Sequence, residues 1–179
     1  MTYRVDGVQY VAVQAGWGGG GWGFVPPYAA AYAKGNANRI LVFKIGGGDV
    51  RVPADLPALQ PAPEPPAQLS GATPAMIATG SALFTDNCSL CHSNQPRAPL
   101  PDLRRMQPGT HEVFDKIVLE GLLVPNGMPR WADVLKPDQV RAIHAFLIDQ
   151  QRQVRARELQ LQREGKPLDS HSLTILSNL

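Results

Sequence analysis

The chain has 179 residues, of which 44% are hydrophobic and 18% are charged, and its formal net charge is +2. This length fits one or two domains, and the apolar fraction allows a packed core. The small net charge, without a basic stripe interleaved with aromatic residues, argues against nucleic acid as a partner. No segment approaches the length of a transmembrane helix, and the first residues lack the basic and apolar regions of an export signal.

Residues 2–45 have the character of β-structure. Residues 2–5 alternate, Asp6-Gly7 is a strong two-residue hairpin turn, and residues 8–14 run back. A third strand is predicted over residues 39–45, just before a run of three glycines. Three strands without a covering helix bury too little surface to be stable alone, so they need neighbours, as the blades of a propeller do.

A glycine-rich segment, residues 16–24, separates the second and third strands. It is not a phosphate-binding loop, because no Gly-Lys-Ser/Thr follows it and no helix opens after it. A solvated flexible loop is one interpretation. Aromatic rings usually stack on a neighbour, however, so Trp17, Trp22 and Phe24 favour a loop that packs against something.

Residues 51–74 are predicted to form a linker. Seven prolines in it remove amide donors and favour extended polyproline geometry, which predicts a semi-rigid spacer rather than a folded element. These are Pro53, Pro57, Pro61, Pro63, Pro65, Pro66 and Pro74. The linker separates a β portion, residues 1–50, from a second domain, residues 75–151, which is followed by a helical extension and tail over residues 152–179.

The second domain is organised around a Cys-x-x-Cys-His motif formed by Cys88, Cys91 and His92. Residues 79–84 are predicted to form a short helix that leads into it. This motif is the attachment signature of a c-type haem: two thiols about one helical turn apart can form thioethers with two vinyl groups, and the next imidazole reaches the iron. His92 is the expected proximal ligand. A redox dithiol would need a strand-helix context, and a zinc site would need a second pair of cysteines.

Other side chains are candidates for contact with such a haem. Met128, in a tight loop after Gly127, is the expected sixth ligand, with Met76 and Met106 as competitors. An ordinary buried methionine is the alternative. Arg104 or Arg105 is able to pair with a haem propionate, since a guanidinium matches a carboxylate in two-point fashion, whereas a solvated arginine is the commoner case.

A helix is predicted after the haem motif over residues 111–120. Thr110 is its expected N-cap, and Gly121 is expected to end it. His111, in the first turn of this helix, is expected to be exposed rather than to be a ligand.

The last predicted helix begins around Pro137. Val140, Ile143 and Leu147 form its core stripe, and Phe146 is expected to pack over Gly80 and Phe84 of the first helix. His144, beside the stripe, is expected to be a satisfied surface or boundary histidine.

The same helix is expected to continue past residue 151 and to end by Gly165. Arg152, Arg155 and Arg157 form a basic run in this extension. The run is most simply a solvated face; a docking surface for an acidic partner is the alternative.

The second domain resembles class I cytochrome c. The resemblance rests on a helix that leads into Cys88-Ser89-Leu90-Cys91-His92, on the loop methionine Met128 and on the final helix. It implies an all-α domain in which the N-terminal helix crosses the C-terminal one and the loop methionine caps the distal side of the haem.

The β portion carries a second resemblance. Residues 3–13, 15–19 and 41–44 resemble the last blade of alcohol dehydrogenases that depend on pyrroloquinoline quinone (PQQ). Members called quinohaemoproteins carry a C-terminal cytochrome c after a linker. The resemblance implies a mixed fold, with a partial antiparallel β blade, that is, a β-propeller fragment, before an all-α cytochrome c domain. It also implies that Gly16 and Trp17 lie near PQQ, and that the calcium ligands and catalytic aspartate belong to earlier blades.

These observations predict electron transfer through a covalently bound haem c, with electrons from alcohol oxidation at PQQ in a longer parent protein. Its partners would be the missing propeller and a downstream acceptor, namely a cytochrome, a blue-copper protein or a membrane quinone pathway. The chain alone is not expected to oxidise alcohols. A periplasmic location is expected, with an export signal upstream of Met1. The alternatives are an autonomous periplasmic cytochrome c without a dehydrogenase domain and a truncated chain that does not mature.

Overall fold

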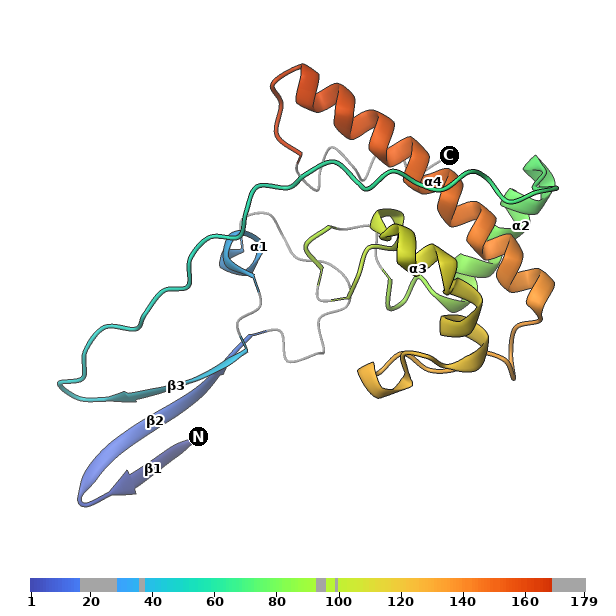
Figure 1. Cartoon of the computed structure of the whole chain (residues 1–179). Helices are drawn as coiled ribbons and strands as arrows, with labels where there is room; N and C mark the ends of the chain where they lie inside the picture. Colours follow the sequence, from blue (N-terminus) through green and yellow to red (C-terminus); the bar gives the residue numbers. More distant parts are fainter. Residues whose placement is uncertain (17–28, 36–37, 93–95, 99, 169–179) are drawn as a thin grey trace.

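The structure is a computed structural model that describes residues 1–16, 29–35, 38–92, 96–98 and 100–168. A small β-sheet lies at one end, a group of helices lies at the other, and a long extended segment connects them (Figure 1). The fold is therefore mixed, as expected, with β-structure first and helices after it. None of the helices in the described ranges combines the length and apolar character needed to cross a membrane.

The sheet contains the three predicted strands in the order β1-β2-β3, and all pairs are antiparallel. β1 spans Thr2–Val5, β2 spans Val8–Ala15 and β3 spans Arg39–Lys44. Asp6 and Gly7 both have positive φ, at 49° and 78°, as the two central residues of a tight hairpin turn require. The hairpin prediction is confirmed.

The sheet has no apolar core of its own. Val5, Val13 and Ile40 keep 49%, 45% and 73% of their surface exposed. A short helix, α1, spans Ala30–Lys34 in the connection between β2 and β3 and buries none of its residues. Large exposed apolar side chains on both faces of a small sheet indicate that it normally packs against further structure.

Two long helices cross at the centre of the helical domain. α2 spans Pro74–Asn87 and α4 spans Pro137–Arg163. The predicted helix before the haem motif is thus longer than expected, because Pro74 occupies its first turn and the Thr73 hydroxyl accepts a hydrogen bond from the Met76 amide at 3.2 Å.

Glycine at position 80 permits this crossing. A Cβ atom there would lie 2.0 Å from the carbonyl oxygen of Ala142 on α4. The prediction of a close approach at Gly80 is confirmed, but the neighbour at this point is the α4 backbone. Phe146 contacts Phe84 instead, with ring centroids 5.6 Å apart.

The chain between α2 and α4 forms short elements. They are η1 (Leu103–Arg105), α3 (Pro108–Glu112), the π-helix η2 (Lys116–Glu120) and η3 (Val124–Asn126). The helix predicted over residues 111–120 is helical in the structure except at Val113, where a turn interrupts it. Its predicted start at Thr110 is wrong, because Pro108 fixes a first turn that begins three residues before His111, with Gln107 as N-cap. Gly121 ends η2 with a left-handed φ of 77°, as predicted.

The hydrophobic core lies between these short elements and the two long helices. Val140, Ile143 and Leu147 of α4 are almost completely buried, which confirms the predicted stripe. Their neighbours in the core come from α2 and from the chain between the helices: Phe84, Met106, Phe114, Ile117, Val118 and Leu135.

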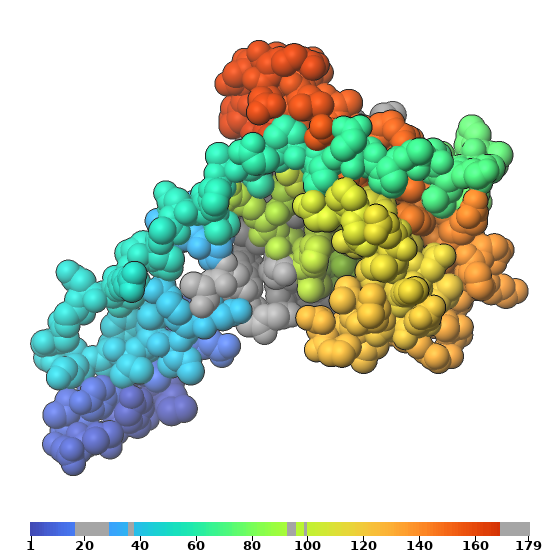
Figure 2. Space-filling view, viewed as in Figure 1, coloured from blue at the N-terminus to red at the C-terminus, as the bar shows by residue number. Residues whose placement is uncertain are grey.

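The linker lies against the helical domain. No helix or strand interrupts residues 45–73, as the proline content predicted. Ala62 is nonetheless fully buried, together with Val154 of α4. Figure 2 shows the linker as a ridge between α4 and the yellow segment that contains α3. As predicted, α4 continues past residue 151, the expected end of the second domain, and ends before Gly165, whose φ is 67°.

Candidate functional site: an apolar pocket at the Cys-x-x-Cys-His motif

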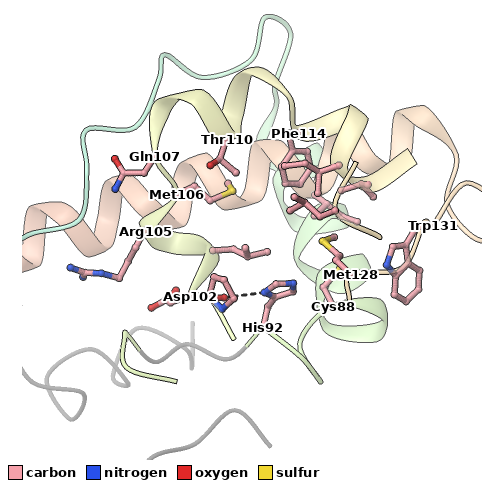
Figure 3. A pocket seen from close by; sticks show the side chains of 16 residues that line it. Cys88, His92, Asp102, Arg105, Met106, Gln107, Thr110, Phe114, Met128 and Trp131 are labelled. Carbon is pink, nitrogen blue, oxygen red and sulfur yellow. Dashed lines mark hydrogen bonds between the residues drawn. The ribbon is translucent and has the colours of Figure 1, made fainter. Parts of the chain in front are cut away.

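An apolar pocket opens beside the end of α2 (Figure 3). Its wall is built by η1, α3, η2 and α4 and by the loop around residue 128. Most of the lining side chains are hydrophobic, and they include Leu103, Phe114, Ile117, Val118, Leu123, Trp131 and Ile143. Such a wall excludes water and suits a large, flat, apolar ligand.

The haem motif occupies the helical turn that follows α2. The amide of Cys88 donates to the Phe84 carbonyl at 2.8 Å, and the amide of His92 donates to the Cys88 carbonyl at 2.9 Å. This turn places Cys88 and His92 in the wall of the pocket and leaves Cys91 exposed. Burial, followed by the nearby Cys91, raises the pKa of the Cys88 thiol to about 11, so the thiol is protonated at neutral pH.

The imidazole of His92 is held in one tautomer. Its Nδ1 lies 3.0 Å from the carbonyl oxygen of Pro101, and because a carbonyl can only accept, Nδ1 carries the proton. In the neutral tautomer that this contact selects, the lone pair of the other ring nitrogen, Nε2, is available for a metal. Figure 3 shows the ring at the pocket, joined by this contact to the segment before Asp102.

Two methionines line the pocket, Met128 and Met106. Met128 is partly buried in the turn after η3, where its amide donates to the Leu123 carbonyl at 3.2 Å. Met106 is 6% exposed and belongs to the hydrophobic core. Met76 lies on α2 and is not part of the pocket wall.

Comparison with known proteins identifies the helical domain. Residues 75–147 match the family model for subunit III of the cbb3-type cytochrome c oxidase. These residues are a cytochrome c domain. Its homologues are the cytochrome c regions of quinohaemoprotein alcohol dehydrogenases, in agreement with the resemblance found in the sequence.

The similarity to these enzymes extends beyond the cytochrome c domain. The chain is 40% identical over 151 residues to quinohaemoprotein alcohol dehydrogenase ADH-IIG of Pseudomonas putida, covering 83% of this chain and 20% of that protein. It is 32% identical over 180 residues to the dehydrogenase subunit of the quinone alcohol dehydrogenase of Acetobacter aceti, covering 93% and 22%. The chain thus spans about a fifth of the length of these relatives.

Solved structures give the same result. The structure of ADHIIG from Pseudomonas putida HK5 matches 99% of this chain and 24% of its own, with a TM-score of 0.68 and 33% identity. The quinohaemoprotein alcohol dehydrogenase of Comamonas testosteroni matches 86% of this chain and 22% of its own, with a TM-score of 0.57 and 27% identity.

The pocket of this cytochrome c domain fits a covalently attached haem c. The Cys88 thiol lies in its wall, and Cys91 is exposed one turn further along. An imidazole nitrogen is free to bind iron, and two thioether sulfur atoms lie in a largely apolar wall. The thiols and the imidazole are the groups that the sequence predicted for Cys88, Cys91 and His92. The assignment of Met128, rather than Met106, as the sixth ligand of the iron stays a prediction.

The two candidate arginines of the cytochrome c domain both have carboxylate partners. Arg104 is 3% exposed and donates to both oxygens of Asp102, the N-cap residue of η1, at 2.9 Å, which makes a two-point pair. Arg105 lines the pocket and pairs with Glu158 of α4. The contact of either with a haem propionate stays a prediction.

A series of buried polar side chains, joined by hydrogen bonds, lies behind the pocket. The Nδ1 atom of His111 lies 2.9 Å from Nε2 of His144, and its Nε2 lies 2.9 Å from the side-chain oxygen of Gln151. The Gln151 amide donates to the carbonyls of Met106 at 2.9 Å and Pro63 at 3.0 Å. Since the amide oxygen accepts from His111, the proton between the two rings belongs to His144.

The expectation that His111 is exposed is therefore wrong, and His144 is buried rather than at the surface. They are only 7% and 8% exposed, because the chain folds His111 against α4 at the level of Phe114. Burial lowers the pKa of both rings. The signal in the sequence was the spacing: His144 and Gln151, seven residues apart on α4, lie on the same side of the helix as Leu147.

The buried histidines His111 and His144 lead us to expect that the haem-loaded protein loses stability in mild acid. Burial, and then the charges of His111 and Arg141, lower the pKa of His144 to about 4. An unfolded histidine takes up its proton near pH 6.5, so the stabilisation is complete above that pH and is lost as the pH falls toward about 4. The free energy of unfolding should drop by up to roughly 3 kcal/mol over this range.

Urea denaturation from about pH 7.5 to about pH 4.5 measures this loss. His144→Gln, which keeps a donor for His111, should flatten the pH dependence. An equal slope in the wild type and the variant would assign the pH effect to other groups.

The residues that the PQQ resemblance singled out lie largely beyond the described structure. Gly16 follows β2 with a φ of 150°. Trp17 lies outside the described residues, so its expected place beside PQQ stays a prediction.

Proposed function

We propose that this chain is an electron-transfer module in which Cys88 and Cys91 would attach haem c, and His92 and Met128 would bind its iron. The observation that carries the proposal is the meeting of Cys88, His92 and Met128 in one apolar pocket. When bound, the haem supplies a one-electron iron couple.

The residues of the chain set the properties of that couple. Pro101 holds His92 through Nδ1, which fixes the ring orientation and makes Nε2 a better donor. The neutral sulfur of Met128 and the dry wall around Phe114, Val118 and Ile143 favour the ferrous form over the more highly charged ferric form, and so raise the reduction potential.

We further propose that the electrons come from PQQ-dependent alcohol oxidation in a propeller of which β1, β2 and β3 form part of the last blade. The exposed apolar side chains of the sheet and the length of the relatives support this. In this arrangement Gly16 and Trp17 lie near PQQ, and calcium and the catalytic base belong to the rest of the propeller. The chain by itself would then oxidise no alcohol.

In this proposal the protein works in the periplasm, after export directed by a signal upstream of Met1. The partner that would accept electrons from this module is a cytochrome, a blue-copper protein or a membrane quinone pathway. A periplasmic cytochrome c without a dehydrogenase is the alternative. The coding sequence upstream of Met1 distinguishes the two: further blades favour the first, and a signal peptide just before Thr2 favours the second.

Covalent attachment is the direct test of the site. Expression in the periplasm with the haem-ligation machinery should give a product one haem heavier than the polypeptide, and acid-acetone should not extract that haem. Cys91→Ser should leave a single thioether, and Cys88→Ser with Cys91→Ser should leave none. A wild-type product that gives up its haem to acid-acetone would contradict the proposed site.

A further inference from the structure

Residues 60–70 of the linker, which we call the strap, are held to α4 through their carbonyl groups. Arg155 donates to the carbonyl of Ala62 at 2.6 Å, and Gln151 donates to that of Pro63 at 3.0 Å. Arg152 and Arg141 reach the carbonyls of Pro66 and Ser70. Prolines have no amide hydrogen, so the strap cannot pair as a strand, and long side chains of α4 satisfy its acceptors instead.

This arrangement accounts for two residues of the basic run on α4. The sequence suggested a solvated face or a docking surface for an acidic partner. In the folded chain Arg155 also pairs with Glu64 of the strap at 2.6 Å. Arg152 and Arg155 therefore serve the contact between the linker and the cytochrome c domain.

A buried carboxylate lies at the centre of this contact. Glu158 of α4 is fully buried, and its Oε2 accepts a hydrogen bond from the amide of Ala62 at 2.5 Å. Its Oε1 pairs with the guanidinium of Arg105. A charge in such a place is retained only when it is paired and hydrogen-bonded, and Glu158 meets both conditions with one strap atom and one pocket residue.

Arg105 connects the strap to the haem pocket. It lines the pocket, as His92 and Met128 do. Its guanidinium turns away from those two residues (Figure 3) and bonds Glu158 and the carbonyl of Gln60 in the strap. One side chain thus forms part of the pocket wall and anchors the linker.

We propose that Glu158 is a positioning residue that couples docking of the strap to the charge balance at the haem pocket. This inference rests on the proposed function. Glu158 holds the Arg105 guanidinium at the edge of the pocket and neutralises its charge, while the second carboxylate oxygen fixes Ala62. Without the carboxylate the positive charge of Arg105 is uncompensated, and an uncompensated positive charge near the haem favours the ferrous form.

The test uses the haem-loaded chain and removes the charge with little change of shape. Glu158→Gln keeps an oxygen that can accept from Ala62. We expect it to raise the midpoint potential, and we expect the double variant Arg105→Gln with Glu158→Gln to return it close to the wild-type value. Glu164→Gln removes an exposed carboxylate from the end of the same helix and is the matched control; it should leave the potential unchanged.

The second readout is hydrogen exchange at the Ala62 amide, followed by NMR. In the wild type and in Glu158→Gln this amide should exchange at least about tenfold more slowly than that of Ala54, an exposed linker residue, and Glu158→Ala should abolish the difference. Loss of structure alone would admit water and so lower the midpoint potential, and adding Arg105→Gln would not restore it. The direction of the shift therefore distinguishes a lost charge balance from a lost structure.

Two results would overturn the inference. One is a Glu158→Gln variant with covalent haem whose potential does not rise. The other needs no variant: an Ala62 amide that exchanges as fast as that of Ala54 in the wild type. Neither result affects the proposed haem site, whereas a wild-type chain that binds no haem covalently would end the proposed function itself.

Discussion

Met128→Ala is expected to abolish the long-wavelength sulfur-to-iron absorption of the ferric, haem-loaded protein and to lower its midpoint potential. A thioether is a weak neutral ligand that favours ferrous iron, and alanine leaves that position to water or to no ligand. Met128 lines the pocket together with Cys88 and His92, on a turn set by η3 and by Gly127 with a φ of 92°. Absorption spectra of the ferric protein and a potentiometric titration measure the two effects.

Met106→Ala is the matched control, since Met106 lines the same pocket. It is 6% exposed and belongs to the core, so its truncation should cost about 2–5 kcal/mol of stability and keep the sulfur-to-iron band. The reverse pattern, with the band lost in Met106→Ala and kept in Met128→Ala, would make Met106 the sixth ligand.

Gly80→Ala should destabilise the domain strongly. In an open helix position this change adds about 1 kcal/mol of stability, because alanine has the higher helix propensity. At position 80 the new Cβ would lie 2.0 Å from the Ala142 carbonyl oxygen and 3.0 Å from the Ile143 nitrogen, so α2 and α4 must move apart. Backbone atoms cannot yield as a flexible side chain does, and we expect a net loss of about 3 kcal/mol.

Denaturation of the haem-loaded variant measures this loss. Gly109→Ala is the control: Gly109 lies in α3, and a Cβ atom there would meet nothing within 4 Å. The control should match the wild type or exceed it slightly. A Gly80→Ala protein as stable as Gly109→Ala would mean that the two helices do not approach as closely as the structure shows.

Local signals predicted well the parts of the fold that neighbouring residues determine. The hairpin at Asp6-Gly7 depends on two positive φ angles, which these two residues adopt readily. α4 begins at Pro137, where a missing amide hydrogen costs nothing, and the break at Gly165 follows from a left-handed φ. The close approach at Gly80 is different, because its partner Ala142 lies on another helix; it was predictable because only glycine lets two helix backbones meet.

Signals of this kind failed where a residue's environment comes from a distant part of the chain. His111 was expected to be exposed in the first turn of a predicted helix, yet it is buried against His144 and Gln151, which lie 33 and 40 residues away. Met106 was named only as a competing ligand in an irregular stretch, and the fold places it both in the pocket wall and in the hydrophobic core. Nothing in the local pattern of either residue records these contacts.

The sequence by itself determined the chemistry of the site, because Cys88, Cys91 and His92 lie within one helical turn and their spacing alone sets what they can bind. It also determined that residues 51–73 form neither helix nor strand, since proline lacks the hydrogen-bond donor, although the last residue of the predicted linker, Pro74, begins α2. Only the tertiary structure decided where that linker lies. Its carbonyls find donors on α4 up to 93 residues away, as between Ala62 and Arg155, and Glu158 is buried because the strap covers it. Such pairings depend on the whole fold, because a strap carbonyl and its donor on α4 meet only when the folded chain brings the two segments together.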